Sequence, residues 1–109
     1  MNYDVCRAGW VGDYADPLTF LGLMRSTDGN NNTGWKNTRY DELLHQSSLE
    51  ADQTKRFAIL REAETLMLDQ MPIIPIYCYV HFYLARPEVK GMNFSVMEHR
   101  SYKTLDVQL

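Results

Sequence analysis

One stretch near the N-terminus groups residues that could bind a ligand. Within residues 7–17 the sequence places Trp10, Asp13 and the glycines Gly9 and Gly12 where an apolar stretch ends. Such junctions commonly build binding sites. Asp13 could receive a cationic group of a ligand, and Trp10 could form a wall of its pocket. Taken alone, these residues favour a simpler interpretation, in which Asp13 is a turn residue and Trp10 belongs to the core.

Signatures of catalysis and of metal binding are absent from the sequence. No nucleophile elbow, phosphate-binding loop, zinc-peptidase motif or dinucleotide-binding motif occurs. The histidines His45, His81 and His99 lie far apart, and no pair has helical ligand spacing. We interpret them as surface histidines or as histidines with ordinary partners. No catalytic residue, metal or cofactor is therefore expected, and an enzyme is a disfavoured class.

The two cysteines, Cys6 and Cys78, are too few and too isolated for a metal site. A disulfide between them requires that their strands be neighbours. The simpler interpretation is a pair of small apolar residues that are buried separately.

Composition sets the class of protein. With 109 residues the chain has the size of one small domain, and its net charge of -3 argues against a nucleic-acid partner. Lysine and arginine are scattered, so an anionic membrane surface is not an obvious partner. The sequence begins without a signal-peptide pattern. Its longest apolar candidate, residues 71–85, is interrupted by Pro72 and Pro75 and is too short to span a bilayer.

Three helices must position the candidate site. Asp16 can cap a short helix, with Pro17 at its first position. Asn37 is a plausible cap for a second helix and Asp52 for a longer third one, which Pro72 ends. A polar loop rich in asparagine separates the first two helices. On the third helix we expect one apolar face and a solvated charged face, comprising Phe57, Leu60, Ala63 and Met67 for the former and Arg56, Arg61 and Glu62 for the latter.

Strands are expected on both sides of the helices. Residues 3–11 read as a strand, and residues 73–80 are the most strand-like segment, with Tyr77 and Tyr79 on one side. A last weak strand falls within residues 102–107. This order predicts an α+β (mixed α/β) fold. The strand-rich C-terminal third has no helix of its own, which suggests that it packs against something outside this chain.

Three stretches of the sequence resemble a known family. The segment from Gly9 to Pro17 resembles a signature of the oligopeptide- and dipeptide-binding proteins of bacterial ABC importers, which are extracellular solute-binding proteins. Two more patterns of the family follow in the same order. They comprise Asn31–Trp35 with Arg39–Leu43, and then Arg56, Ala63-Glu64 and Pro72–Tyr77. The likeness covers about Val5 to Leu84.

The resemblance implies a larger parent protein, several-fold longer, whose two lobes close over a peptide. This chain looks like the C-terminal part of that two-lobed periplasmic-binding-protein-like fold. Residues 1–80 would belong to the C-terminal ligand-binding lobe, and residues 81–109 would return toward the N-terminal lobe. The parent would be periplasmic or otherwise extracytoplasmic, with or without a lipid anchor.

The resemblance also implies roles for individual residues. Asp13 would pair with the α-ammonium group of the peptide, because a cation that leaves water needs a charged partner. The backbone from Gly9 through Val11 and Gly12 would bond to the peptide main chain like an added strand. Trp10 would shape the pocket wall. Captured oligopeptides or dipeptides would then pass to a membrane permease.

Alternatives remain at this point. The same class includes binders of nickel, sugars and other solutes. A protein of a different class is a free-standing small interaction domain, in which Trp10 and residues 73–80 form a protein-binding surface. As a fragment, the chain should bind peptide weakly or not at all and should self-associate through exposed edges.

Overall fold

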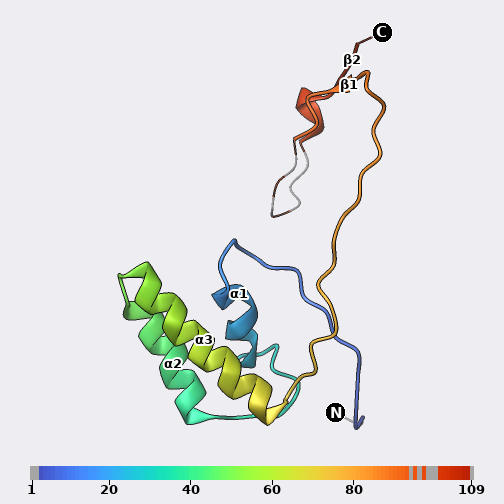
Figure 1. Ribbon diagram of the computed structural model, residues 1–109. Coiled ribbons are helices and arrows are strands. Elements are labelled where there is room, and N and C mark those ends of the chain that lie inside the picture. The colour runs from blue at the N-terminus through green and yellow to red at the C-terminus, as the bar shows by residue number, and fades with distance from the viewer. Residues whose placement is uncertain (1–2, 94, 96, 98–100, 109) are drawn as a thin grey trace. The chain divides into compact units, whose positions relative to one another are not determined.

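The computed structural model describes residues 3–93, 95, 97 and 101–108 and divides the chain into two units after Ile74. The first unit is helical, and the second contains an extended stretch followed by a small sheet (Figure 1). The helical elements of the first unit are α1 (Leu18–Leu21), the 3-10 helix η1 (Gly22–Met24), α2 (Thr38–Leu49) and α3 (Gln53–Gln70).

The ends of α2 and α3 lie where the sequence predicts them. Asn37 Oδ1 accepts a backbone N–H of the first turn of α2 at 3.0 Å, and Asp52 Oδ1 does the same for α3 at 2.9 Å. Helix α3 ends at Gln70, two residues before Pro72. Met71, between them, takes the left-handed conformation with φ 48°. The caps predicted at Asn37 and Asp52 and the predicted stop are confirmed. The start predicted for the short helix is one residue early, because α1 begins at Leu18 with Pro17 at the cap position, although Asp16 Oδ1 accepts the N–H of Leu18.

The core lies between α2 and α3, which run side by side (Figure 1). Each helix contributes a buried stripe at helical spacing, comprising Tyr40, Leu43, Leu44 and Ser47 on α2 and Leu60, Ala63 and Met67 on α3. Burying one such apolar side chain stabilises the fold by about 1.5–3 kcal/mol. Phe57, predicted for the same face, is 43% exposed. At 3.6 residues per turn it lies about 90° from the centre of the stripe.

Tyr40 ties the loop before α2 to both neighbouring helices. Its hydroxyl donates to the carbonyl oxygen of Leu21 at 2.7 Å, and burial raises the pKa of Tyr40 above its ordinary value. The ring meets Trp35 edge-on, with centroids 4.9 Å apart. The indole N–H of Trp35 donates to Gln70 Oε1 at 2.8 Å. The loop is therefore an ordered part of the helical unit.

Two predicted strands are wrong for this chain taken by itself. Neither residues 3–11 nor residues 73–80 form a ladder within the described part of the chain. The sheet there consists of β1 (Val89–Lys90) paired antiparallel with β2 (Asp106–Val107), which lies within the weak strand predicted over 102–107. A strand is defined by its partner, and these stretches have none here. The α+β prediction therefore holds only in coarse form, as a mostly helical chain with a small sheet.

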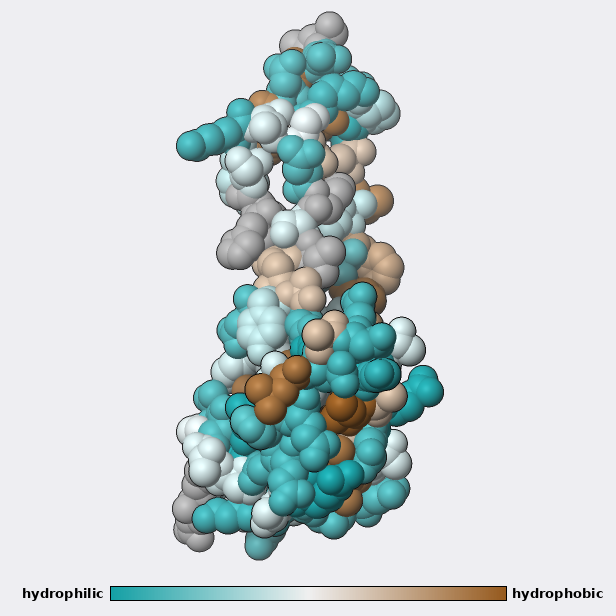
Figure 2. All heavy atoms as spheres, turned by 90° about the vertical axis from the view of Figure 1, so that its left-hand side faces the viewer, coloured by the Kyte–Doolittle hydropathy of each residue, from teal (hydrophilic) through white to brown (hydrophobic). Residues whose placement is uncertain are grey.

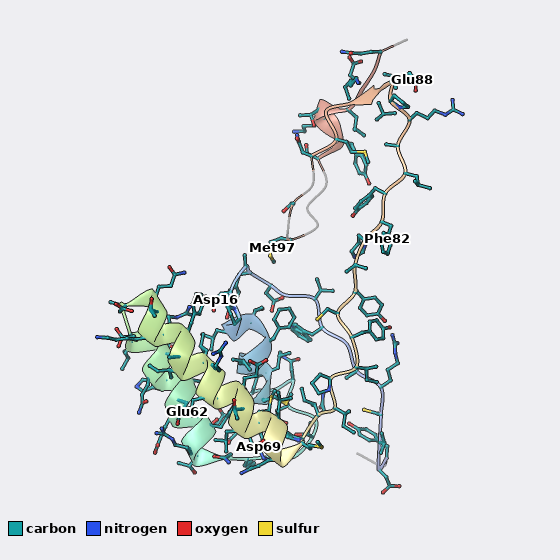
Figure 3. The ribbon with its side chains drawn as sticks, viewed as in Figure 1. Asp16, Glu62, Asp69, Phe82, Glu88 and Met97 are labelled. Carbon is teal, nitrogen blue, oxygen red and sulfur yellow. The ribbon has the colours of Figure 1, made fainter. Side chains whose placement is uncertain are left out.

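The extended stretch of residues 75–84 leaves its apolar side chains uncovered. Ile76 is 85% exposed and Phe82 is 89% exposed, and Phe82 projects from the chain in Figure 3. Tyr77 and Tyr79 do share one side, with ring centroids 4.8 Å apart. By contrast, the face of the helical unit seen in Figure 2 is predominantly hydrophilic. The burial predicted for residues 73–80 is thus not realised among the residues that the structure describes.

Candidate functional site

The segment that leads to Asp13 has a free main chain. Gly9, Trp10, Val11 and Gly12 make no backbone–backbone hydrogen bond with any residue that the structure describes. The side chain of Trp10 is 42% exposed, and Val11 is also exposed. Unpaired N–H and C=O groups in a row can accept another extended chain as an added strand.

Gly12 marks the point where this segment meets α1. A Cβ at Gly12 would lie 3.1 Å from Thr19 Cγ2 and 3.2 Å from Phe20 Cζ, whereas a Cβ at Gly9 would meet nothing within 4 Å. The backbone N–H of the next residue, Asp13, donates to Thr19 Oγ1 at 2.9 Å. The turn therefore rests directly on the first turn of α1, and a side chain at Gly12 would press on Thr19 and Phe20.

Asp13 has an exposed carboxylate without a hydrogen-bond or ion-pair partner among the described residues. It lines an open hollow of about 410 Å³ together with Trp10, Tyr14 and Arg25. Ligand pockets commonly have volumes of this order. The Nε atom of Arg25 is buried and has no hydrogen-bond partner in the described part of the chain. The hollow thus carries both an uncompensated carboxylate and an incompletely bonded guanidinium.

Asp16, three positions further on, has the opposite environment. Its two carboxylate oxygens each accept a hydrogen bond of 2.7 Å from Arg56 of α3, and Oδ1 also accepts the N–H of Leu18 at 2.9 Å. Figure 3 shows Asp16 at the start of α1. The bonds from Arg56 lower the pKa of the Asp16 carboxyl below its ordinary value. The prediction that Arg56 lies on a solvated face is wrong, because the side chains of this pair are only 20% and 25% exposed.

The structure brings some predicted site residues together and leaves others apart. Trp10 and Asp13 line the same hollow, whereas Gly9, Val11 and Gly12 contribute main chain beside it and do not line it. Thr19 and Arg56 were missed as contributors to this region. A hydroxyl within the apolar run of residues 18–21 is a weak local signal for Thr19. The residues around Arg56 do not reveal its role, because its partner Asp16 lies 40 positions away in the sequence.

Other candidate chemistry is not assembled. Cys6 and Cys78 are free and exposed, which contradicts their interpretation as buried residues. No group of three or more metal-ligating side chains occurs among the described residues, and His99 lies outside them. Within the same residues, no helix has the length and apolar character needed to cross a membrane.

Sequence comparison relates the chain to known solute-binding proteins. No family model matches it. It is 44% identical over 92 residues to the oligopeptide-binding protein OppA of Bacillus subtilis, a match that covers 84% of this chain and 17% of that protein. It is 37% identical over 90 residues to YgiS of Escherichia coli, named a probable deoxycholate-binding periplasmic protein, with 83% and 17% covered.

A solved structure matches as well. The unliganded open form of MppA, a periplasmic murein tripeptide-binding protein, superimposes with a TM-score of 0.70 at 35% identity, covering 90% of this chain and 19% of MppA. The chain thus spans less than a fifth of the length of each of these proteins. It is homologous to one portion of the oligopeptide- and dipeptide-binding proteins of bacteria.

Proposed function

We propose that this chain is part of the substrate-binding component of an ABC importer that captures oligopeptides or dipeptides. The observation that carries the proposal is the carboxylate of Asp13, which has no partner among the described residues and lines a hollow at the end of a main-chain segment that makes no backbone hydrogen bond to them. In this proposal residues 1–80 belong to the C-terminal ligand-binding lobe and residues 81–109 return toward the N-terminal lobe. The 17% coverage of OppA supports a parent of several times this length.

The chemistry of capture follows from these groups. Asp13 receives the α-ammonium group of the peptide, and the backbone of Gly9, Val11 and Gly12 bonds to the peptide main chain. Trp10 forms a wall beside them. One charge and a row of main-chain bonds fix the end and register of a peptide without reading its side chains. Selectivity among peptides would accordingly be broad.

The rest of the mechanism lies in the parent protein. Its lobes close over the ligand, and the closed form delivers the peptide to a membrane permease. A location outside the cytoplasm is supported by relatives that are named periplasmic, MppA and YgiS. The 109-residue chain alone should self-associate through its exposed apolar residues, which sedimentation would detect as species above 12.7 kDa.

The test is a titration of the full-length protein with trialanine and with N-acetyl-trialanine, which lacks the ammonium group. Trialanine should bind and the acetylated peptide should bind far more weakly. Asp13→Asn should weaken trialanine binding more than a hundredfold, since breaking a buried ion pair costs about 3–5 kcal/mol. The control is Asp69→Asn on the exposed side of α3, which should change nothing (Figure 3). Equal affinity for both peptides would refute the role of Asp13.

A second candidate function is the binding of a non-peptide solute. The homology to YgiS favours it, because that relative is named for a bile acid and not for a peptide. Deoxycholate carries a carboxylate and no ammonium group, so it cannot form an ion pair with the carboxylate of Asp13. The same titration separates the two functions. Binding of deoxycholate by the full-length protein, unaffected by Asp13→Asn and without binding of trialanine, would support this candidate.

A further inference from the structure

The carboxylates of Asp13 and Asp16 lie three residues apart and have different surroundings. Asp16 is held by both nitrogens of the Arg56 fork, whereas Asp13 has no side-chain partner among the described residues. A carboxylate that is left free for a ligand still needs a fixed place. Groups that are already positioned before binding give higher affinity, because less ordering is required when the ligand arrives. The place of Asp13 must therefore be set through its backbone.

Thr19 is the side chain that contacts this backbone. It is 5% exposed, and its Oγ1 accepts the N–H of Asp13 at 2.9 Å. Its methyl carbon lies where it would be 3.1 Å from a Cβ at Gly12. The hydroxyl and the methyl group of one side chain thus hold two successive residues of the turn.

The helix that carries Thr19 is itself fixed. Asp16 Oδ1 accepts the N–H of Leu18 in the first turn of α1, and the same carboxylate is bonded to Arg56 of α3. Leu21, at the other end of α1, is buried in the core. A chain of contacts therefore runs from α3 through Asp16 and α1 to Thr19 and ends at the backbone of Asp13.

We infer that Thr19 is a positioning residue for ligand capture, whose hydroxyl holds the Asp13 backbone so that the carboxylate faces the ligand's cationic group. The Arg56–Asp16 pair serves the same end indirectly, because it holds the helix that carries Thr19. This inference rests on the proposed function, in which Asp13 receives an ammonium group. It adds a residue that never touches the ligand and yet affects its affinity.

The test uses the full-length protein with two substitutions at one position. Thr19→Val keeps the shape and removes the hydroxyl, and it should weaken trialanine binding by about fivefold, the effect of one lost hydrogen bond. Thr19→Ser keeps the hydroxyl and should stay within about twofold of the unaltered protein. In an Asp13→Asn background, Thr19→Val should cause no further loss, because Thr19 acts through Asp13.

A second measurement does not depend on any ligand. The amide of Asp13 should exchange its hydrogen slowly in the unaltered protein and in Thr19→Ser, and faster in Thr19→Val. Equal exchange in all three would overturn the inference, as would a loss from Thr19→Val that persists in the Asp13→Asn background. If trialanine fails to bind the unaltered protein, the proposed function fails and this role in capture falls with it. If trialanine binds and depends on Asp13 but not on Thr19, only the positioning role fails.

Discussion

The helices and the extended stretch of this chain use apolar residues in opposite ways. Between Leu18 and Gln70 the large apolar side chains of α2 and α3 meet one another, and Leu44 is fully buried. Between residues 75 and 84 the aliphatic side chains stay exposed, with Ile76 at 85%, and the ring contact of Tyr77 is with Tyr79 of the same stretch. The first region obtains its partners from within the chain. The second has the composition of a buried strand and no ladder partner among the described residues, which accords with the proposal that its neighbours belong to a longer protein.

The largest expected effect tests this contrast directly. Leu44→Ala should lower the free energy of unfolding of the 109-residue chain by about 2–5 kcal/mol, because it leaves a cavity in the core. Ile76→Ala should change it by less than about 0.5 kcal/mol, since the side chain is exposed. Urea unfolding followed by circular dichroism measures both.

The same pair of substitutions in the full-length protein sharpens the comparison. If neighbours from the parent cover Ile76, Ile76→Ala should there cost about 2–5 kcal/mol, like a core substitution. A negligible cost in both lengths of chain would mean that residues 75–84 remain uncovered, and the proposed fragment would lose its main structural support.

An intermediate effect is expected within the helical unit, where Arg56 of α3 holds the start of α1 through Asp16. Arg56→Met should lower the free energy of unfolding at pH 7 by about 1–3 kcal/mol, because Asp16 loses a charged partner. The control is Arg61→Met, an exposed position on the same helix, which should cost less than about 0.5 kcal/mol.

The pH dependence of this effect has a fixed sign. Arg56 lowers the pKa of Asp16, so its contribution is present above about pH 4 and is lost as the pH falls through the folded-state pKa. The difference between Arg56→Met and the unaltered protein should therefore shrink in acid. A difference that stays constant from pH 7 to pH 2 would argue that the ion pair makes no contribution.

The smallest effect distinguishes two glycines of the same segment. Gly12→Ala should cost about 1 kcal/mol, because the added carbon presses on Thr19 and Phe20. Gly9→Ala enters open space and should leave stability unchanged or slightly raised. Thermal unfolding of the two variants would compare them, and equal melting temperatures would mean that the turn does not rest on α1.

Local chemistry made part of this structure predictable. The caps Asn37 and Asp52 and the stop before Pro72 depend on neighbouring residues only, and they lie where the sequence predicts them. The core stripe of α3 was also predictable except for Phe57, which is rotated away from its centre. Periodicity describes a helix face but does not say how wide a face its neighbour covers.

The predictions that depended on distant partners were weaker. Residues 73–80 have the composition of a strand, but no segment in the described part of the chain pairs with them. Arg56 was assigned to solvent because its partner Asp16 lies on another element. For the candidate site, Asp13 and Trp10 could be proposed from the sequence as ligand-binding residues. The support beneath them, from Thr19 and Arg56, required three-dimensional contacts.

The two tryptophans of the chain lie in unlike surroundings. The indole of Trp35 stands against the ring of Tyr40 and bonds to Gln70, so its ultraviolet emission reports whether the helices are packed. The indole of Trp10 lies at the hollow and is partly open to water, so its emission responds to whatever enters there. The protein therefore carries two intrinsic fluorophores, one that senses folding and one that senses occupancy, with no label attached.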